Sequence, residues 1–107
     1  MSRDRLIVEV HGVPAGVLSR DADRYAFTYL TGYHGPCVSL TMPVRDQSYV
    51  YTGLPPFFDG LLPEGIGLEG LLRSRKLDRR DWMGQLRAVG RDVPGAVTLR
   101  DPKSDEL

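Results

Sequence analysis

The sequence contains no asparagine, one cysteine and only two histidines. Without asparagine the chain has no acceptor for N-glycosylation, and it lacks the residue that holds the second magnesium ion in the usual catalytic loop of protein kinases. Cys37 is the one cysteine, so it has no partner for an internal disulfide. These absences exclude a protein kinase acting by itself and favour a cytoplasmic protein.

Long apolar runs and an excess of either charge are absent as well. No stretch approaches the roughly 18 apolar residues that a membrane span needs, and polar and turn residues interrupt the N-terminal region where a signal peptide would lie. Fourteen basic and fourteen acidic residues give a net charge of zero. Because a surface that neutralises phosphates is basic, we expect no direct binding to nucleic acid, and none to membranes.

What the sequence does contain fits one small domain. Its 107 residues are 41% hydrophobic, which suffices for a single modest core. We expect the domain to occupy residues 1–100. Residues 101–107 are expected to form a polar C-terminal tail with little to bury.

Apolar residues that alternate with polar ones predict strands over much of the chain. The clearest case places Tyr25, Phe27 and Tyr29 on one face of a strand. Turn residues between the first segments indicate antiparallel hairpins. The predicted strands are residues 6–10, 15–19, 25–30, 38–42 and 96–99.

Three short helices are predicted between the last two strands. The first starts at the proline pair 55–56 and lasts about two turns. A joint at residues 63–67 precedes the second, which starts at Leu68 and ends in a cationic run. The third follows a capping pattern at residues 78–81 and closes at Gly90 in a left-handed conformation. Together these elements predict an α+β fold, a small, mostly antiparallel β-sheet or partly open barrel capped by about three short helices.

Catalytic or metal chemistry has few candidates. His11 and His34 are separated by two predicted strands, and neither lies at a helical spacing from another ligand type. Cys37 follows His34 closely, but a lone cysteine is more often a small buried hydrophobe. No nucleophile and base can be paired. We therefore predict that the protein is not an enzyme and has no catalytic residue, metal or cofactor.

Two motifs could suggest phosphate binding. Gly65, Gly67 and Gly70 form G-x-G-x-x-G, but that fingerprint must follow a strand in a βαβ unit, and here it follows a predicted helix. Basic residues are frequent in 73–80, where a helix C-terminus attracts cations in any case. We favour a chance match and a solvated helix end.

The joint at 63–67 is the best candidate for contact with a partner. Ile66 stands there between two glycines, where it either projects outwards as an apolar anchor or packs against the helix that follows. We predict a partner-binding site whose residues are Pro63, Glu64, Gly65, Ile66 and Gly67.

Three segments together resemble a known family. They are Val-Ser-Leu-Thr-Met-Pro-Val at 38–44, Phe-Phe-Asp-Gly-Leu-Leu-Pro-Glu-Gly at 57–65, and Val-Gly-Arg-Asp-Val-Pro-Gly-Ala-Val-Thr-Leu at 89–99. In order and approximate spacing they resemble the N-terminal subdomain of HipA-type toxin kinases. The resemblance runs from the first hairpin to residue 99 and implies a small barrel-like sheet capped by helices.

The resemblance also implies a function. A HipA-type kinase continues into ATP-binding and catalytic parts that this sequence lacks, and a free-standing N-terminal piece resembles the HipS antitoxins of tripartite HipBST modules. It implies a non-catalytic, cytoplasmic antitoxin that neutralises a HipA- or HipT-like serine/threonine kinase toxin by protein–protein contact. A HipB-like helix-turn-helix DNA-binding protein is a further candidate partner, in a ternary complex. The alternative is the truncated N-terminal structural domain of a one-piece HipA-type kinase, which contacts that kinase's repressor.

Overall fold

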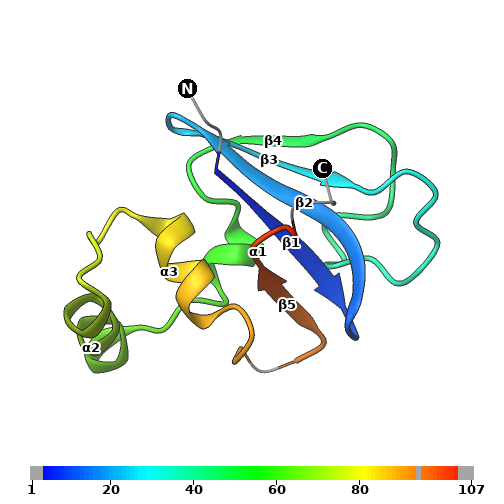
Figure 1. Cartoon of the computed structure of the whole chain (residues 1–107). Coiled ribbons are helices and arrows are strands. Elements are labelled where there is room, and N and C mark those ends of the chain that lie inside the picture. The colour runs from blue at the N-terminus through cyan, green and yellow to red at the C-terminus, as the bar shows by residue number, and fades with distance from the viewer. Residues whose placement is uncertain (1–3, 94, 104–107) are drawn as a thin grey trace.

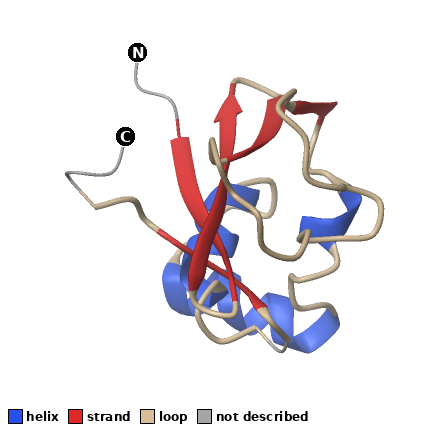
Figure 2. Cartoon of the chain, turned by 90° about the vertical axis from the view of Figure 1, so that its right-hand side faces the viewer, coloured by secondary structure: helices blue, strands red, loops and turns tan. Residues whose placement is uncertain are grey.

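The architecture is one antiparallel sheet with helices packed against one face (Figures 1 and 2). The structure is a computed structural model that describes residues 4–93 and 95–103. Its five strands lie in the order β4-β3-β2-β1-β5. The strands are β1 (Asp4–Val10), β2 (Val13–Asp21), β3 (Arg24–Tyr29), β4 (Tyr49–Thr52) and β5 (Val97–Arg100), and the helices are α1 (Pro56–Asp59), α2 (Gly65–Arg75) and α3 (Trp82–Val89). The predicted α+β class is confirmed.

The first three predicted strands and the last are present. His11 and Gly12 join β1 to β2 with φ of 52° and 79°, and positive φ at both turn positions matches the twist of a two-residue hairpin. β2 pairs with β3, and β1 with β5, also antiparallel. The strands therefore follow the turn chemistry of the sequence.

One face of the sheet forms the core. Alternate residues of β1 and all three aromatic residues predicted to share a face of β3 are buried, as is Phe58 of α1. The Phe58 ring lies 5.7 Å from that of Phe27. α3 packs on β1 and β5, whereas the main helix contact of α2 is with α3, so α2 lies at the edge of the molecule (Figure 1).

The strand predicted at 38–42 is wrong. Ser39 and Met42 form an isolated bridge across a tight turn, and the fourth strand is β4. The Ser39 hydroxyl accepts a hydrogen bond from Thr41 N at 3.3 Å, and local bonds of this kind compete with a strand ladder. Leu40 at the turn is 95% exposed, while Val38 and Met42 are buried, so the period-two pattern reflects the two buried ends of a turn.

Tyr29 fixes this turn to the sheet. Its buried hydroxyl accepts a hydrogen bond from Val38 N at 2.9 Å and donates one to the carbonyl oxygen of Met42. Burial raises the pKa of this hydroxyl above its ordinary value. The hydroxyl therefore satisfies two main-chain groups that would otherwise be unpaired in the core.

Tyr29→Phe is expected to lower the free energy of unfolding by about 1–3 kcal/mol, because two buried main-chain groups lose their partner. Urea denaturation at neutral pH measures the loss. The matched control is Tyr33→Phe, whose hydroxyl donates to the Pro36 carbonyl oxygen at an exposed position and should cost less than about 1 kcal/mol. Equal losses in the two variants would contradict the role given to Tyr29.

The first two helices differ from the predicted ones. α1 ends at Asp59, and Leu61 N and Leu62 N then bond to carbonyl oxygens three residues earlier. Pro63 disfavours a helical conformation at the residue before it, which explains why α1 is shorter than two turns. α2 begins at Gly65, not Leu68, so residues 65–67 form its first turn.

Both ends of α3 differ from the predicted ones: the capping pattern at 78–81 predicted Asp78 as the N-cap, but the N-cap is Asp81 and the helix begins at Trp82. Asp81 accepts a hydrogen bond from Gly84 N at 3.0 Å. Gly90 has a φ of −57°, so the predicted left-handed conformation is wrong; the left-handed cap is at Lys76 of α2, with a φ of 54°. Instead, the Gly90 carbonyl oxygen accepts from Leu99 N at 2.9 Å, which joins α3 to the outer edge of β5.

Ion pairs connect the helix layer to the sheet and to the start of the tail. Arg20 lies 2.7 Å from Asp4 and 3.9 Å from Asp81, and Arg87 lies 3.6 Å from Asp4 and 2.6 Å from Asp101. These groups are partly exposed, so each pair contributes at most about 1 kcal/mol. Of the tail predicted at 101–107, residues 104–107 lie outside the described residues.

Candidate interaction surface

The five predicted partner-binding residues lie at the start of α2 and in the link before it. Pro63 is half-buried, and Glu64 is an exposed N-cap whose side chain makes no capping hydrogen bond. Gly65 has a φ of 57°, a conformation that glycine adopts without strain. Ile66 is 92% exposed and Gly67 is exposed. The alternative in which Ile66 packs against the helix does not hold, because its side chain faces solvent.

α2 has two distinct faces. Its half-buried side, here called the leucine face, consists of Leu68, Leu71 and Leu72, and no residue of the helix is fully buried. At about 100° per residue, Ile66 projects from the opposite side. The helix therefore holds an apolar side chain in solvent and is fixed to the domain through the leucine face.

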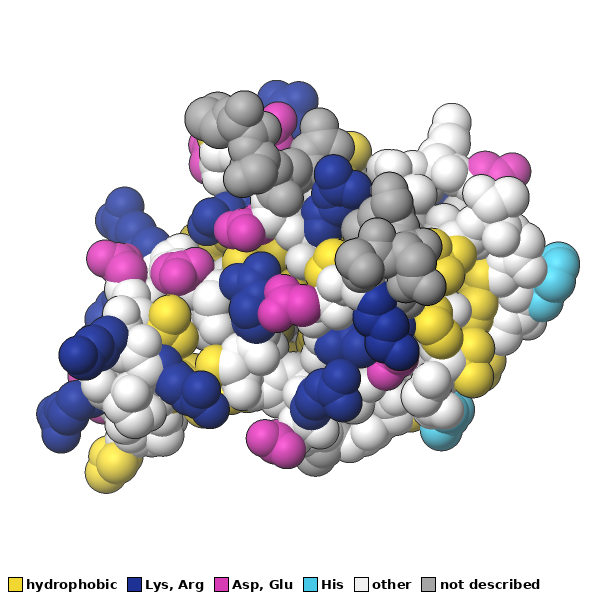
Figure 3. Space-filling model, viewed as in Figure 1, with side chains coloured by type: hydrophobic (Ala, Val, Ile, Leu, Met, Phe, Trp, Pro, Cys, Tyr) yellow, Lys and Arg dark blue, Asp and Glu magenta, His cyan; other side chains and the backbone are white. Residues whose placement is uncertain are grey.

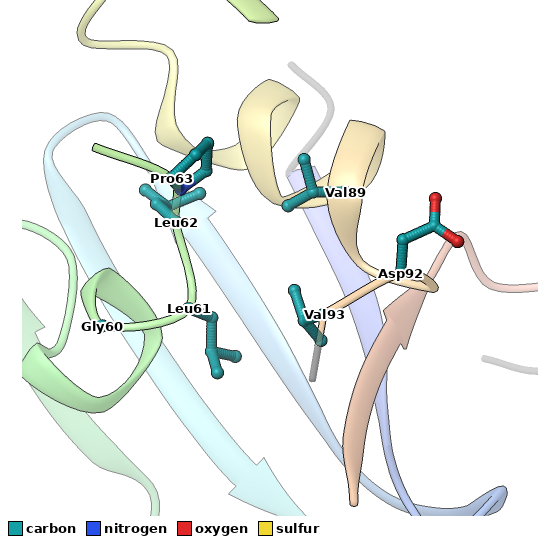
Figure 4. A pocket seen from close by; sticks show the side chains of 7 residues that line it. All are labelled: Gly60, Leu61, Leu62, Pro63, Val89, Asp92 and Val93. Atoms are coloured by element: carbon teal, nitrogen blue, oxygen red, sulfur yellow. The ribbon is translucent and has the colours of Figure 1, made fainter. Parts of the chain in front are cut away.

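A hollow of about 490 Å³ lies beside this link (Figure 4). One wall is the link between α1 and α2, and the other is the end of α3 with the loop that follows. Two of the three segments that carry the family resemblance, 57–65 and 89–99, thus face each other across it. Its lining residues are Gly60, Leu61, Leu62, Pro63, Val89, Asp92 and Val93.

Smaller hollows lie next to the same link. One of about 320 Å³ includes Leu61, and one of about 220 Å³ includes Leu62 and Pro63. Residues 61–63 are therefore flanked by concave surface. The sequence predicts the site only at 63–67. The two motifs at 57–65 and 89–99 were the signal that could have extended it, because two specific motifs in one small domain lie close together.

The basic residues of 73–80, here called the cationic run, follow the leucine face and are exposed: Arg73, Arg75, Lys76, Arg79 and Arg80. Within it, Arg79 donates a hydrogen bond to the Glu69 carboxylate, and both side chains are more than half exposed. This hydrogen bond, together with the charge of Arg79, holds the pKa of Glu69 below its ordinary value. The pair connects α2 to the loop that leads into α3.

The candidate ligands for a metal are only partly brought together. His11 and Cys37 line the 320 Å³ hollow, but His34 does not. Among residues 4–93 and 95–103, no three His, Cys, Asp or Glu side chains form a group that could hold a metal ion. The glycines of G-x-G-x-x-G belong to α2, which follows α1 and an irregular link and not a strand, so the dinucleotide-binding context is absent.

The purified domain is expected to bind neither ATP nor Zn²⁺ nor a DNA duplex, because each candidate motif lacks the geometry its ligand requires. Titration calorimetry with each of the three at physiological salt measures this. Micromolar binding of any one would contradict a role based on protein contact alone.

Comparison with known proteins agrees with this geometry. The family described as HipA N-terminal domain matches residues 6–100. A curated uncharacterized protein of Haemophilus influenzae is 28% identical over 96 residues, which are 90% of this chain and 91% of that protein. A solved structure of the N-terminal domain of HipA toxin has a TM-score of 0.71 and 24% identity, and the match covers 98% of this chain and 97% of that one. Both named matches concern the N-terminal domain of HipA and not its kinase catalytic part. Among the helices of the described residues, none has the length and apolar character to cross a membrane.

Proposed function

The chain belongs to the HipA N-terminal domain family, and we propose that it is a non-catalytic antitoxin. Its proposed partner is a HipA- or HipT-like serine/threonine kinase toxin that lacks this domain, which it binds and neutralises by direct contact. We also propose that the chain acts in the cytoplasm, where the kinase is. The proposal includes a ternary complex of this chain, the kinase and a HipB-like helix-turn-helix protein.

The exposed Ile66 is the observation that carries this proposal. A side chain that is 92% exposed on the first turn of a helix has no role in the fold, and apolar anchors of this kind provide much of the binding energy of protein interfaces. Pro63, Glu64, Gly65 and Gly67 surround it and are proposed as the rest of the contact. Pro63 also lines the hollow beside the link, which adds concave, largely apolar surface to the proposed contact.

The Haemophilus influenzae relative supports a separate protein over a domain of a longer kinase. Because the 96 aligned residues are 91% of that relative, it is a chain of about the same length. We propose that in a one-piece kinase the same surface contacts the rest of the enzyme. A separate chain with this surface can occupy the corresponding place on a kinase that lacks it.

Co-expression tests the proposal. A kinase encoded next to this chain, without an N-terminal domain of its own, should stop growth when induced alone, and this chain should restore growth. Purified chain should also suppress phosphorylation by that kinase in a dose-dependent manner. Unchanged toxicity at full expression of the folded chain would contradict an antitoxin. A continuous reading frame that joins this chain to a kinase would favour the alternative, a structural domain of a one-piece enzyme.

A further inference from the structure

The side of α2 opposite the leucine face has an ordered composition. Ile66, Gly70 and Arg73 lie at positions i, i+4 and i+7, so they share one face of the helix, and all three are exposed. At 1.5 Å per residue, Ile66 and Arg73 are about 10 Å apart along the helix axis. We call these three residues the outer face of α2.

Gly70 makes the middle of the outer face flat. A Cβ atom added at Gly70 would meet no atom within 4 Å, so the fold itself has room for a larger residue. A glycine inside a helix is less stable than alanine by about 1 kcal/mol. The absent side chain instead lets another backbone approach the helix closely between Ile66 and Arg73.

The cationic run gives the C-terminal end of this helix a local excess of positive charge. Residues 73–80 contain five basic side chains and one acidic one, in a chain whose net charge is zero. Figure 3 shows Lys and Arg side chains around the end of the molecule where α2 lies. The local excess of positive charge is therefore a property of this end of the domain.

Arg79 of this run is paired with Glu69, but Arg75 and Arg80 differ from the arginines that stabilise the sheet. Arg20, Arg87 and Arg100 each have a carboxylate partner. Within the described part of the chain, Arg75 and Arg80 have no acidic side chain at ion-pair distance. Their charge remains available to a partner.

We propose that the outer face of α2 docks on an acidic protein surface, in which an apolar pocket takes Ile66 and carboxylates about 10 Å further along the helix axis meet Arg73 and the cations after it. This inference rests on the proposed function, since the same kinase would provide that surface. Nucleic acid fits less well, because phosphates would pair with the cations but offer no apolar pocket for Ile66. The charges then act mainly on the rate at which the two proteins associate.

Association kinetics with the kinase that lacks its N-terminal domain test this inference. Arg73→Glu is expected to slow association about tenfold, and the wild-type rate should fall by a similar factor when NaCl rises from about 50 to 500 mM. The matched control is Arg5→Glu, which makes the same change in charge at an exposed position on the face of the sheet away from the helices. This control should alter the association rate less than about twofold. Arg73→Lys keeps the positive charge, so it should associate at the wild-type rate. Circular dichroism checks that α2 is intact.

The outcomes separate this inference from the proposed function. If wild type binds and Ile66→Asp abolishes binding, but neither Arg73→Glu nor salt changes the rate, the docking of the cations is wrong and the antitoxin proposal stands. If wild type does not bind the kinase, the proposed function fails first and this inference with it. If a DNA duplex of about 20 base pairs binds at physiological salt through Arg73 while kinase binding is unaffected, the cations serve nucleic acid and the inference is overturned.

Discussion

Gly90→Val is expected to destabilise the domain by about 3 kcal/mol or more, because overpacking against main-chain atoms cannot be relieved by side-chain rotation. A Cβ atom at Gly90 would lie 2.5 Å from the Leu99 carbonyl oxygen and 2.7 Å from the Leu86 carbonyl oxygen. These groups belong to β5 and α3, which would have to separate. The hydrogen bond from Leu99 N to the Gly90 carbonyl oxygen would then be lost.

Thermal denaturation measures this loss, which corresponds to a fall in melting temperature of about 10 °C or more for a domain of this size. Gly70→Val is the control, since a Cβ there meets nothing within 4 Å, and it should change stability by less than about 1 kcal/mol. Gly90→Asn tests whether this position needs glycine because of a left-handed backbone or because of its close contacts with main-chain atoms. Asparagine tolerates the left-handed conformation, so a mild effect would support a left-handed cap, whereas the steric explanation requires a severe one.

Ile66→Asp is expected to leave the fold intact and to weaken kinase binding at least 100-fold. The side chain is 92% exposed, and an acidic residue in the first turn of a helix is not unfavourable. In an interface, by contrast, a buried carboxylate without a partner costs several kcal/mol. Growth rescue of cells that express the kinase, with circular dichroism of the variant, measures both effects. Glu64→Ala should change binding by less than about 1 kcal/mol, as a contact at the rim.

Leu40→Asp provides the matched control for Ile66→Asp. Leu40 is equally exposed, at 95%, but belongs to the loop between β3 and β4, at the opposite end of the molecule from α2 (Figure 1). The Leu40→Asp variant should neutralise the kinase as well as the wild-type protein does. Full rescue by a folded Ile66→Asp protein would instead move the interface away from α2, with the exposed side of the 78–89 region as the next candidate.

Local patterns were sufficient to predict most of the sheet. Turn residues and alternation locate β1, β2, β3 and β5. Each of these strands either is joined to the next by a short turn or carries a clear apolar face. β4 was missed since Tyr49 and Tyr51 alternate over only four residues, while residues 38–42 carry a longer pattern. That pattern arises from a turn whose ends are buried through Tyr29, a long-range contact that no local rule contains.

The candidate site was predicted in part. The glycines around Ile66 indicated an exposed joint, and the structure places Ile66 in solvent, although on the first turn of α2. The hollow beside residues 60–63 depends on Val89 and Val93, which reach it only through the packing of α3 on the sheet. The role of Gly90 was also beyond a local rule, since the close approach of β5 requires this glycine.

The most direct test of the central claim is the binding of this chain to the kinase that lacks an N-terminal domain, measured by calorimetry together with the activity of the mixture. We expect a one-to-one complex with a dissociation constant below about 1 μM in which phosphorylation is suppressed. Absence of a complex, or a complex in which the kinase keeps its full activity, would contradict it.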